Sequence, residues 1–215
     1  MSAPPLVVGF DLDLTLIDSR PGIAATLRAL LAERPVADDV RLDVEELCER
    51  LGPPLDHMLA PYYPADLLPE LVDRFRVLYP DHAVAATPAL VGAHEALAAV
   101  RSHGGRTVVV TGKFTPNAAR HVALLRLEID HLSGELWGVG KAEALREQGA
   151  TVYVGDHVHD VEGALAADAL SVSVLTGGCT EAELRAAGTH VVLRDLGEFP
   201  AWFDEHVRSL RETRV

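Results

Sequence analysis

The sequence predicts an α/β fold, a doubly wound parallel sheet that carries a small inserted helical segment. Short runs rich in Val and Leu alternate with segments of helical length, which is the pattern of strands and crossover helices in a buried parallel sheet. One stretch near the N-terminus has helical periodicity and no convincing strand. Polar residues directly follow several of the Val-rich runs, at the edge where open parallel sheets bind ligands.

The elements of the sheet domain are predicted from these runs and from capping signals. Strands are expected at residues 6–11, 107–111, 151–155, 170–175 and 190–193. Proline in a first turn, a capping box of Thr180 with Glu183, and glycine after a last turn frame helices between the strands. These helices are expected at residues 93–103, 118–126, 142–147 and 180–188.

Residues 17–86 are predicted to form the helical insert. The apolar positions that repeat with helical spacing are Ile23, Leu27, Leu30 and Leu31. Prolines at positions 53, 54, 61, 64, 69 and 80 are expected to break the segment into short helices. We therefore predict a small bundle, joined by two connections to a catalytic core of residues 1–16 and 87–215.

Composition narrows the classes of function. The 215 residues suffice for one core with a small inserted module. A formal charge of −13 argues against binding to nucleic acid or to an anionic membrane, so a small ligand is the better hypothesis. Only Cys48 and Cys179 are present and the start does not resemble a signal peptide, so a reduced cytoplasmic setting is expected. No apolar run approaches the roughly 20 residues of a membrane span.

Two acidic residues, Asp11 and Asp13, follow the first strand directly, and Thr15 comes next in the alternation. A second acidic pair, Asp156 and Asp160, follows the strand at residues 151–155. Carboxylates gathered at the carboxyl edge of a parallel sheet can converge on a divalent cation, which needs oxygen ligands. Turn-forming aspartates are the structural alternative for any single pair.

The only two lysines of the chain lie beside these motifs, although the chain has 19 basic residues. Thr111-Gly112-Lys113 ends the second predicted strand and offers a hydroxyl and backbone N–H groups to a phosphoryl oxygen. Lys141 precedes the helix at residues 142–147. A position that uses lysine in this arginine-rich chain favours a compact ammonium on a flexible stem over a planar guanidinium, which singles out both lysines, while codon bias is the plain alternative.

Taken in order, the motifs resemble the haloacid dehalogenase (HAD) superfamily, in its phosphoglycolate-phosphatase-like branch. The resemblance rests on Asp11-x-Asp13-x-Thr15, Thr111-Gly112, Lys141 and Gly155-Asp156-x-x-x-Asp160, and spans nearly the whole chain. It implies a Rossmann-like core, a cap domain in the place of the insert, and an Mg²⁺-dependent phosphatase acting on a small phosphorylated metabolite.

The resemblance also implies roles. Asp11 would be the nucleophile that forms an aspartyl-phosphate, and Asp13 would protonate the leaving alcohol and then deprotonate water. Mg²⁺ would be held by Asp11, Asp156 and the backbone carbonyl of Asp13, with Asp160 orienting the metal shell. The groups implied to hold the phosphoryl oxygens are Thr111, Gly112 and Lys141.

The sequence departs from the family pattern at two positions and leaves the roles of three other residues open. The family usually has glycine where this chain has Leu14, which restricts the backbone beside the nucleophile, and proline where it has Ala142. Lys113 is equally well interpreted as a phosphate ligand or as a solvated charge. His157 and His159 invite a metal-ligand interpretation, but Mg²⁺ prefers oxygen.

Other functions use similar residues. A sugar-phosphate mutase would discharge the same phospho-aspartate to a second hydroxyl, and a dehalogenase is disfavoured because Asp13 supplies acid/base chemistry that phosphoryl transfer uses. A receiver-like signalling module also combines aspartates, Thr and Lys, but in another order and without a helical insert. The sequence leaves open which phosphomonoester is used, and whether the protein is a monomer or a homodimer.

Overall fold

The computed structural model describes residues 6–49 and 51–212. Its centre is a six-stranded sheet in which all neighbouring strands are parallel, in the order β3-β2-β1-β4-β5-β6. The strands are β1 (Val7–Phe10), β2 (Arg106–Val110), β3 (His131–Ser133), β4 (Val152–Gly155), β5 (Leu170–Val174) and β6 (Val191–Leu193). The direction of winding reverses between β1 and β4, and open α/β sheets bind ligands beyond such a switch point. The predicted fold class is therefore confirmed.

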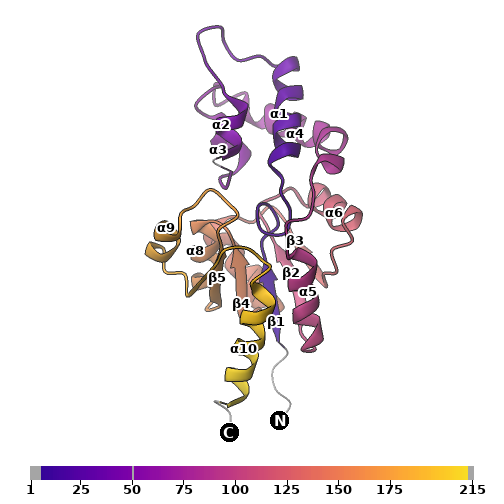
Figure 1. Cartoon of the computed structure of the whole chain (residues 1–215). Coiled ribbons are helices and arrows are strands. Elements are labelled where there is room, and N and C mark those ends of the chain that lie inside the picture. The colour runs from indigo at the N-terminus through magenta and orange to yellow at the C-terminus, as the bar shows by residue number, and fades with distance from the viewer. Residues whose placement is uncertain (1–5, 50, 213–215) are drawn as a thin grey trace.

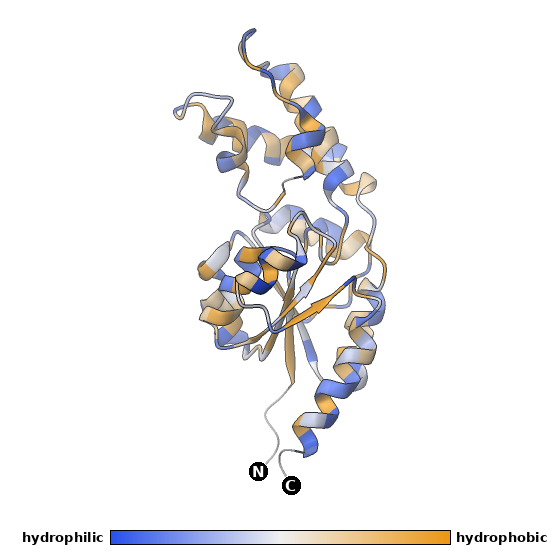
Figure 2. Cartoon of the chain, turned by 60° about the vertical axis from the view of Figure 1, so that its left-hand side comes forward, coloured by the Kyte–Doolittle hydropathy of each residue, from blue (hydrophilic) through white to orange (hydrophobic). Residues whose placement is uncertain are grey.

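Apolar side chains alternate between the two faces of the central strands, which gives the sheet a core on each side. In β2, Val109 belongs to one buried cluster, whereas Val108 and Val110 belong to the other. Helices α5 (Ala93–Ser102) and α10 (Phe199–Glu212) cover the first face, and α7 (Lys141–Gln148) and α8 (Val158–Ala166) cover the second. Figure 2 shows the apolar strands enclosed by helices of mixed hydropathy.

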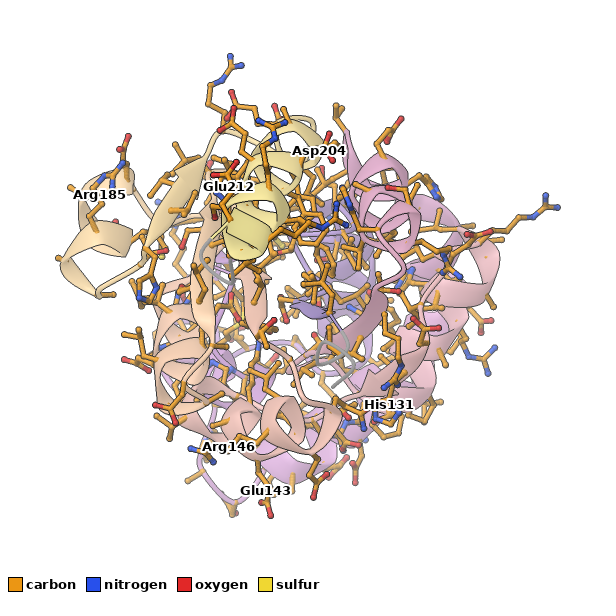
Figure 3. The ribbon with its side chains drawn as sticks, turned by 90° about the horizontal axis from the view of Figure 1, so that it is seen from below. His131, Glu143, Arg146, Arg185, Asp204 and Glu212 are labelled. Atoms are coloured by element: carbon orange, nitrogen blue, oxygen red, sulfur yellow. The ribbon has the colours of Figure 1, made fainter. Side chains whose placement is uncertain are left out.

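The remaining helices of the sheet domain are α6 (Thr115–Leu124), η2 (Gly138–Gly140) and α9 (Glu181–Ala186). Seen from below, charged side chains of the outer helices point away from the sheet (Figure 3). Arg146 on α7, Arg185 on α9 and Glu212 on α10 are labelled examples. Within the described residues, every helix is too short or too polar to cross a lipid bilayer.

The predicted helical insert forms a separate body above the sheet (Figure 1). It contains α1 (Arg20–Glu33), α2 (Val44–Glu49), α3 (Leu55–Leu59), α4 (Leu68–His82) and η1 (Val84–Ala86). These helices bury an apolar cluster of their own, to which Leu27, Leu59 and Phe75 contribute. The domain boundaries at residues 17 and 86 stay a prediction.

The structure corrects three details. Pro69 lies in the first turn of α4 and Pro80 inside that helix, so neither breaks the segment as predicted. β3 was missed because its three residues, His131, Leu132 and Ser133, contain no run of Val or Leu. α10 was also missed, although Phe199, Phe203 and Val207 recur every fourth residue and form its buried side.

Candidate active site

Three buried carboxylates meet at the carboxyl ends of the two central strands. Asp11 follows β1, Asp156 follows β4, and Asp160 lies in the first turn of α8. One carboxylate oxygen of each lies within 4.8 Å of the others. The sequence motifs placed these residues at this edge, and the fold brings them together.

Neighbouring groups fix the orientation of two of these carboxylates. Thr15 Oγ1 donates to Asp156 Oδ1 at 3.0 Å. Asp160 Oδ2 accepts from the backbone N–H groups of Asp156 and His157 at 3.2 and 3.1 Å, which caps α8. Position 155 requires glycine, because a Cβ there would lie 2.4 Å from the Asp160 side chain.

Lys141 reaches the carboxylate cluster from the start of α7. Its buried ammonium lies 2.9 Å from Asp11 Oδ1 and 2.5 Å from Asp160 Oδ1, and it donates to the Tyr153 hydroxyl at 2.9 Å. Tyr153 in turn donates to the Val110 carbonyl at 2.6 Å. Nothing in the sequence motifs pointed to Tyr153, which positions the lysine from inside the sheet core.

The cluster carries more negative charge than Lys141 offsets. Burial raises the pKa of Asp11 to about 7, although Lys141 opposes the shift. Burial, and then the charges of Asp160 and Asp11, raise the pKa of Asp156 well above its ordinary value. Three carboxylates therefore converge beside a single ammonium. A hard divalent ion prefers such oxygen ligands and would balance the remaining negative charge, so Asp11, Asp156 and Asp160 fit a bound metal.

A second ion pair lies beside the first. Lys113 Nζ is 2.7 Å from Asp13 Oδ1, and the Asp13 side chain keeps about 25% of its surface exposed. Burial acts to raise the pKa of Asp13, but Lys113 outweighs it and the pKa is lowered. The structure thus places Lys113 on Asp13 and not in solvent.

An aromatic contact joins this pair to the insert. The Lys113 ammonium lies 4.5 Å from the centre of the Tyr79 ring on α4. The Tyr79 hydroxyl lies 3.0 Å from His121 Nε2 on α6. Both rings are buried. No sequence motif indicates this contact, since residues 79 and 121 come together only through packing of the insert on the sheet domain.

The buried His121 predicts a pH-dependent stability. Burial, followed by the charge of Lys113, lowers its pKa from 6.5 to about 4. The folded protein therefore favours neutral His121. The resulting contribution to the unfolding free energy is fully present above pH 6.5 and is lost as the pH falls through about 4. Between about pH 8 and about pH 4.5, wild type should lose about 2 kcal/mol more unfolding free energy than His121→Gln, measured by urea denaturation. Equal losses in the two proteins would contradict this assignment.

The predicted phosphate-binding residues line a cavity of about 230 Å³ together with the carboxylates. Thr111 is buried at the end of β2, and its hydroxyl accepts from the Lys113 backbone N–H at 3.3 Å. Gly112 and Lys141 also face this cavity. The predicted residues therefore share one site, and their roles toward a phosphate stay predictions.

The two histidines of the fourth motif lie at the rim of the same cavity. His159 packs on the Trp137 ring at 4.0 Å between centroids, and its Nδ1 lies 2.8 Å from Glu162. The Trp137 indole N–H donates to the Gly52 carbonyl at 3.1 Å, which links this rim to the insert. Among the described residues, the carboxylate cluster includes no histidine.

Leu14 has an unusual backbone for its residue type. Its φ is +57°, in the left-handed region that costs a residue with a Cβ about 1–2 kcal/mol. Its side chain is fully buried and packs in the apolar cluster of the insert. The loop therefore keeps the conformation that suits glycine, and burial of Leu14 offsets the strain.

Comparison with known proteins shows the family to which this chain belongs. The model of the haloacid dehalogenase-like hydrolases matches residues 8–165. The chain belongs to this family. The prediction of a HAD-type hydrolase, made from the order of the motifs, is thereby confirmed.

Individual relatives agree with this HAD assignment. A phosphoglycolate phosphatase of Caulobacter vibrioides is 28% identical, over 90% of this chain and 88% of that protein. A predicted phosphatase from Clostridium acetobutylicum has the same fold, with a TM-score of 0.80 at 23% identity, over 94% of this chain and all of the other. A HAD family hydrolase from Deinococcus radiodurans, solved with bound phosphate and sodium, gives a TM-score of 0.67 at 23% identity, over 95% and 97% of the two chains.

Proposed function

We propose that this HAD hydrolase is an Mg²⁺-dependent phosphatase that hydrolyses a small phosphomonoester through an aspartyl-phosphate at Asp11. The observation that carries the proposal is the different environment of two carboxylates on one loop. Asp11 lies in the carboxylate cluster beside Lys141, whereas Asp13 pairs with Lys113, and both line the same cavity. Two carboxylates held in distinct surroundings suit the two roles of nucleophile and acid/base.

In the first step a carboxylate oxygen of Asp11 attacks phosphorus, and the bond from phosphorus to the alcohol oxygen breaks. Asp13 gives its proton to that oxygen, so the alcohol leaves neutral. Asp13 must carry a proton at this point, although Lys113 lowers its pKa in the free protein. The phosphate dianion, bound beside Asp13, raises that pKa again because like charges disfavour ionisation.

In the second step water attacks the phosphorus of the aspartyl-phosphate. Asp13, now ionised, accepts a proton from this water, the acyl phosphate bond breaks, and Asp11 is regenerated with release of inorganic phosphate. The Lys113 ammonium stabilises the ionised form of Asp13 between the two steps. One difficult displacement thus becomes two easier ones.

Mg²⁺ would be held by Asp11 and Asp156, with Asp160 orienting the metal shell and with the Asp13 backbone carbonyl as the further ligand that the family resemblance implies. When bound it supplies positive charge that offsets the repulsion between the nucleophile and the phosphate. Lys141, Thr111 and the backbone at Gly112 would hold the phosphoryl oxygens. The insert would act as the cap that excludes water from the cavity.

The substrate class taken from the relatives is a small phosphorylated metabolite, with phosphoglycolate the first compound to test. The cytoplasmic setting and the choice between monomer and homodimer stay predictions. No feature of the described residues favours a mutase, and the family match runs against a receiver-like module.

The test is release of inorganic phosphate from a panel of phosphomonoesters, with Mg²⁺ and after removal of divalent ions by chelation. We expect turnover with Mg²⁺ and a loss of at least about 100-fold after chelation, since the metal supplies several kcal/mol of charge stabilisation. Added Mg²⁺ should restore the rate. Equal turnover in both conditions would exclude the proposed role of the metal.

A further inference from the structure

The cavity has a charged floor and an apolar roof. The floor consists of the carboxylates and lysines at the strand ends, where the phosphoryl group would lie. The roof belongs to the insert, and its apolar members are Ile23, Leu51, Leu55, Met58, Val72 and Phe75. The alcohol part of the substrate, which is the leaving group, must therefore face this roof.

Leu14 adds an apolar side chain from the core. It directly follows Asp13, the residue proposed to protonate the leaving oxygen, and it lines the same cavity. Its side chain is only 1% exposed and packs in the apolar cluster of the insert, so it supports the apolar roof from behind.

Every cationic side chain that the structure describes around this cavity already has an acidic partner. Lys141 is held by Asp11 and Asp160, and Lys113 is held by Asp13. The third cationic side chain that lines the cavity is Arg76 of the insert.

Two acidic side chains and one aromatic ring surround Arg76, so its single positive charge faces two negative charges. Its guanidinium nitrogens lie 3.5 Å from Asp73 and 3.3 Å from Glu135, and its Cζ lies 4.5 Å from the centre of the Phe114 ring.

Among the residues described, no further lysine or arginine lines the cavity, and of its two histidines His159 pairs with Glu162 and His157 caps α8. Arg50 lies outside the described residues.

We propose that the leaving group of the natural substrate is an uncharged alcohol with an apolar hydrocarbon part, and not a carboxylate-bearing one such as glycolate. This inference rests on the proposed phosphatase function. A carboxylate placed under the roof would lose its hydration without gaining a cation. A hydrocarbon group would bury apolar surface there, at about 25 cal/mol per Å².

Two phosphonates separate this inference from the phosphatase proposal, because their C–P bond is not hydrolysed. Phenylpropylphosphonate mimics phenylethyl phosphate, and phosphonopropionate mimics phosphoglycolate. We expect calorimetry on the wild-type protein with saturating Mg²⁺ to give at least about tenfold tighter binding of phenylpropylphosphonate. Equal affinities, tighter binding of phosphonopropionate, or binding of neither would overturn the inference.

A folded variant with an added positive charge in the roof tests the same inference in the opposite direction. Val72 lies on α4, one turn before Arg76, and is only partly buried. Val72→Lys should tighten phosphonopropionate about tenfold and weaken phenylpropylphosphonate, whereas Val77→Lys, which adds the same charge at an exposed position of α4 outside the cavity, should change the first affinity less than about twofold. An unchanged phosphonopropionate affinity in a folded Val72→Lys protein would contradict the placement of the leaving group.

Turnover measured in parallel distinguishes the leaving-group inference from the phosphatase proposal. If phenylpropylphosphonate binds more tightly but phenylethyl phosphate releases no phosphate, the apolar preference stands and the phosphatase proposal fails. If phosphoglycolate is hydrolysed with a higher kcat/KM than phenylethyl phosphate and phosphonopropionate binds more tightly, the phosphatase proposal stands and the leaving-group inference fails.

Discussion

Asp11→Asn lowers kcat at least about 10⁴-fold for every phosphomonoester that the wild type hydrolyses. The amide is nearly isosteric but is a poor nucleophile, so no aspartyl-phosphate forms. The variant should stay folded, because the amide removes a buried carboxylate whose pKa is already raised to about 7. Phosphate release under saturating Mg²⁺ measures the effect.

Asp18→Asn is the matched control. Asp18 lies on the same loop, 3.5 Å from Arg20, with about 30% of its side chain exposed. This substitution should change kcat less than about twofold, because Asp18 does not line the cavity and the asparagine Oδ1 can still accept from the Arg20 backbone N–H. Comparable losses in the two variants would show that Asp11 acts through the loop and not as a nucleophile.

Asp13→Asn lowers kcat about 10²–10⁴-fold for alkyl phosphates, because the leaving alcohol then lacks its proton donor. Nitrophenyl phosphate needs no such donor, since nitrophenolate leaves without a proton. With this substrate the variant should release one equivalent of nitrophenolate per active site in a rapid burst. Slow turnover should follow, because water attack still lacks its base.

Stopped-flow absorbance of nitrophenolate measures this burst. The control is Asp11→Asn, which should give no burst with the same substrate. A slow, linear release in Asp13→Asn without a burst would contradict the division of roles between Asp11 and Asp13.

Local patterns were sufficient to predict the core of the site. Strand-length apolar runs ending in Asp11, Thr111 and Asp156 predicted the edge at which these side chains meet, and the structure brings them to one cavity. Parallel strands make this possible, because their carboxyl ends meet at one edge. The scarcity of lysine also singled out both lysines that contact the carboxylates.

Contacts between distant segments could not be predicted in this way. Tyr153 has an ordinary strand position, and only the fold shows that its hydroxyl meets Lys141. Tyr79 and His121 lie 42 residues apart and meet through the packing of the insert. The apolar roof of the cavity likewise depends on how α3 and α4 face the sheet, which no motif encodes.

Chemical trapping of the aspartyl-phosphate tests covalent catalysis by Asp11. Asp13→Asn is mixed with nitrophenyl phosphate and Mg²⁺, quenched in acid at the end of the burst, reduced with borohydride and analysed by peptide mass spectrometry. We expect Asp11 to be converted to homoserine, the reduction product of its acyl phosphate, in the same amount as the burst. A burst with unmodified Asp11, or with the label on another residue, would contradict it.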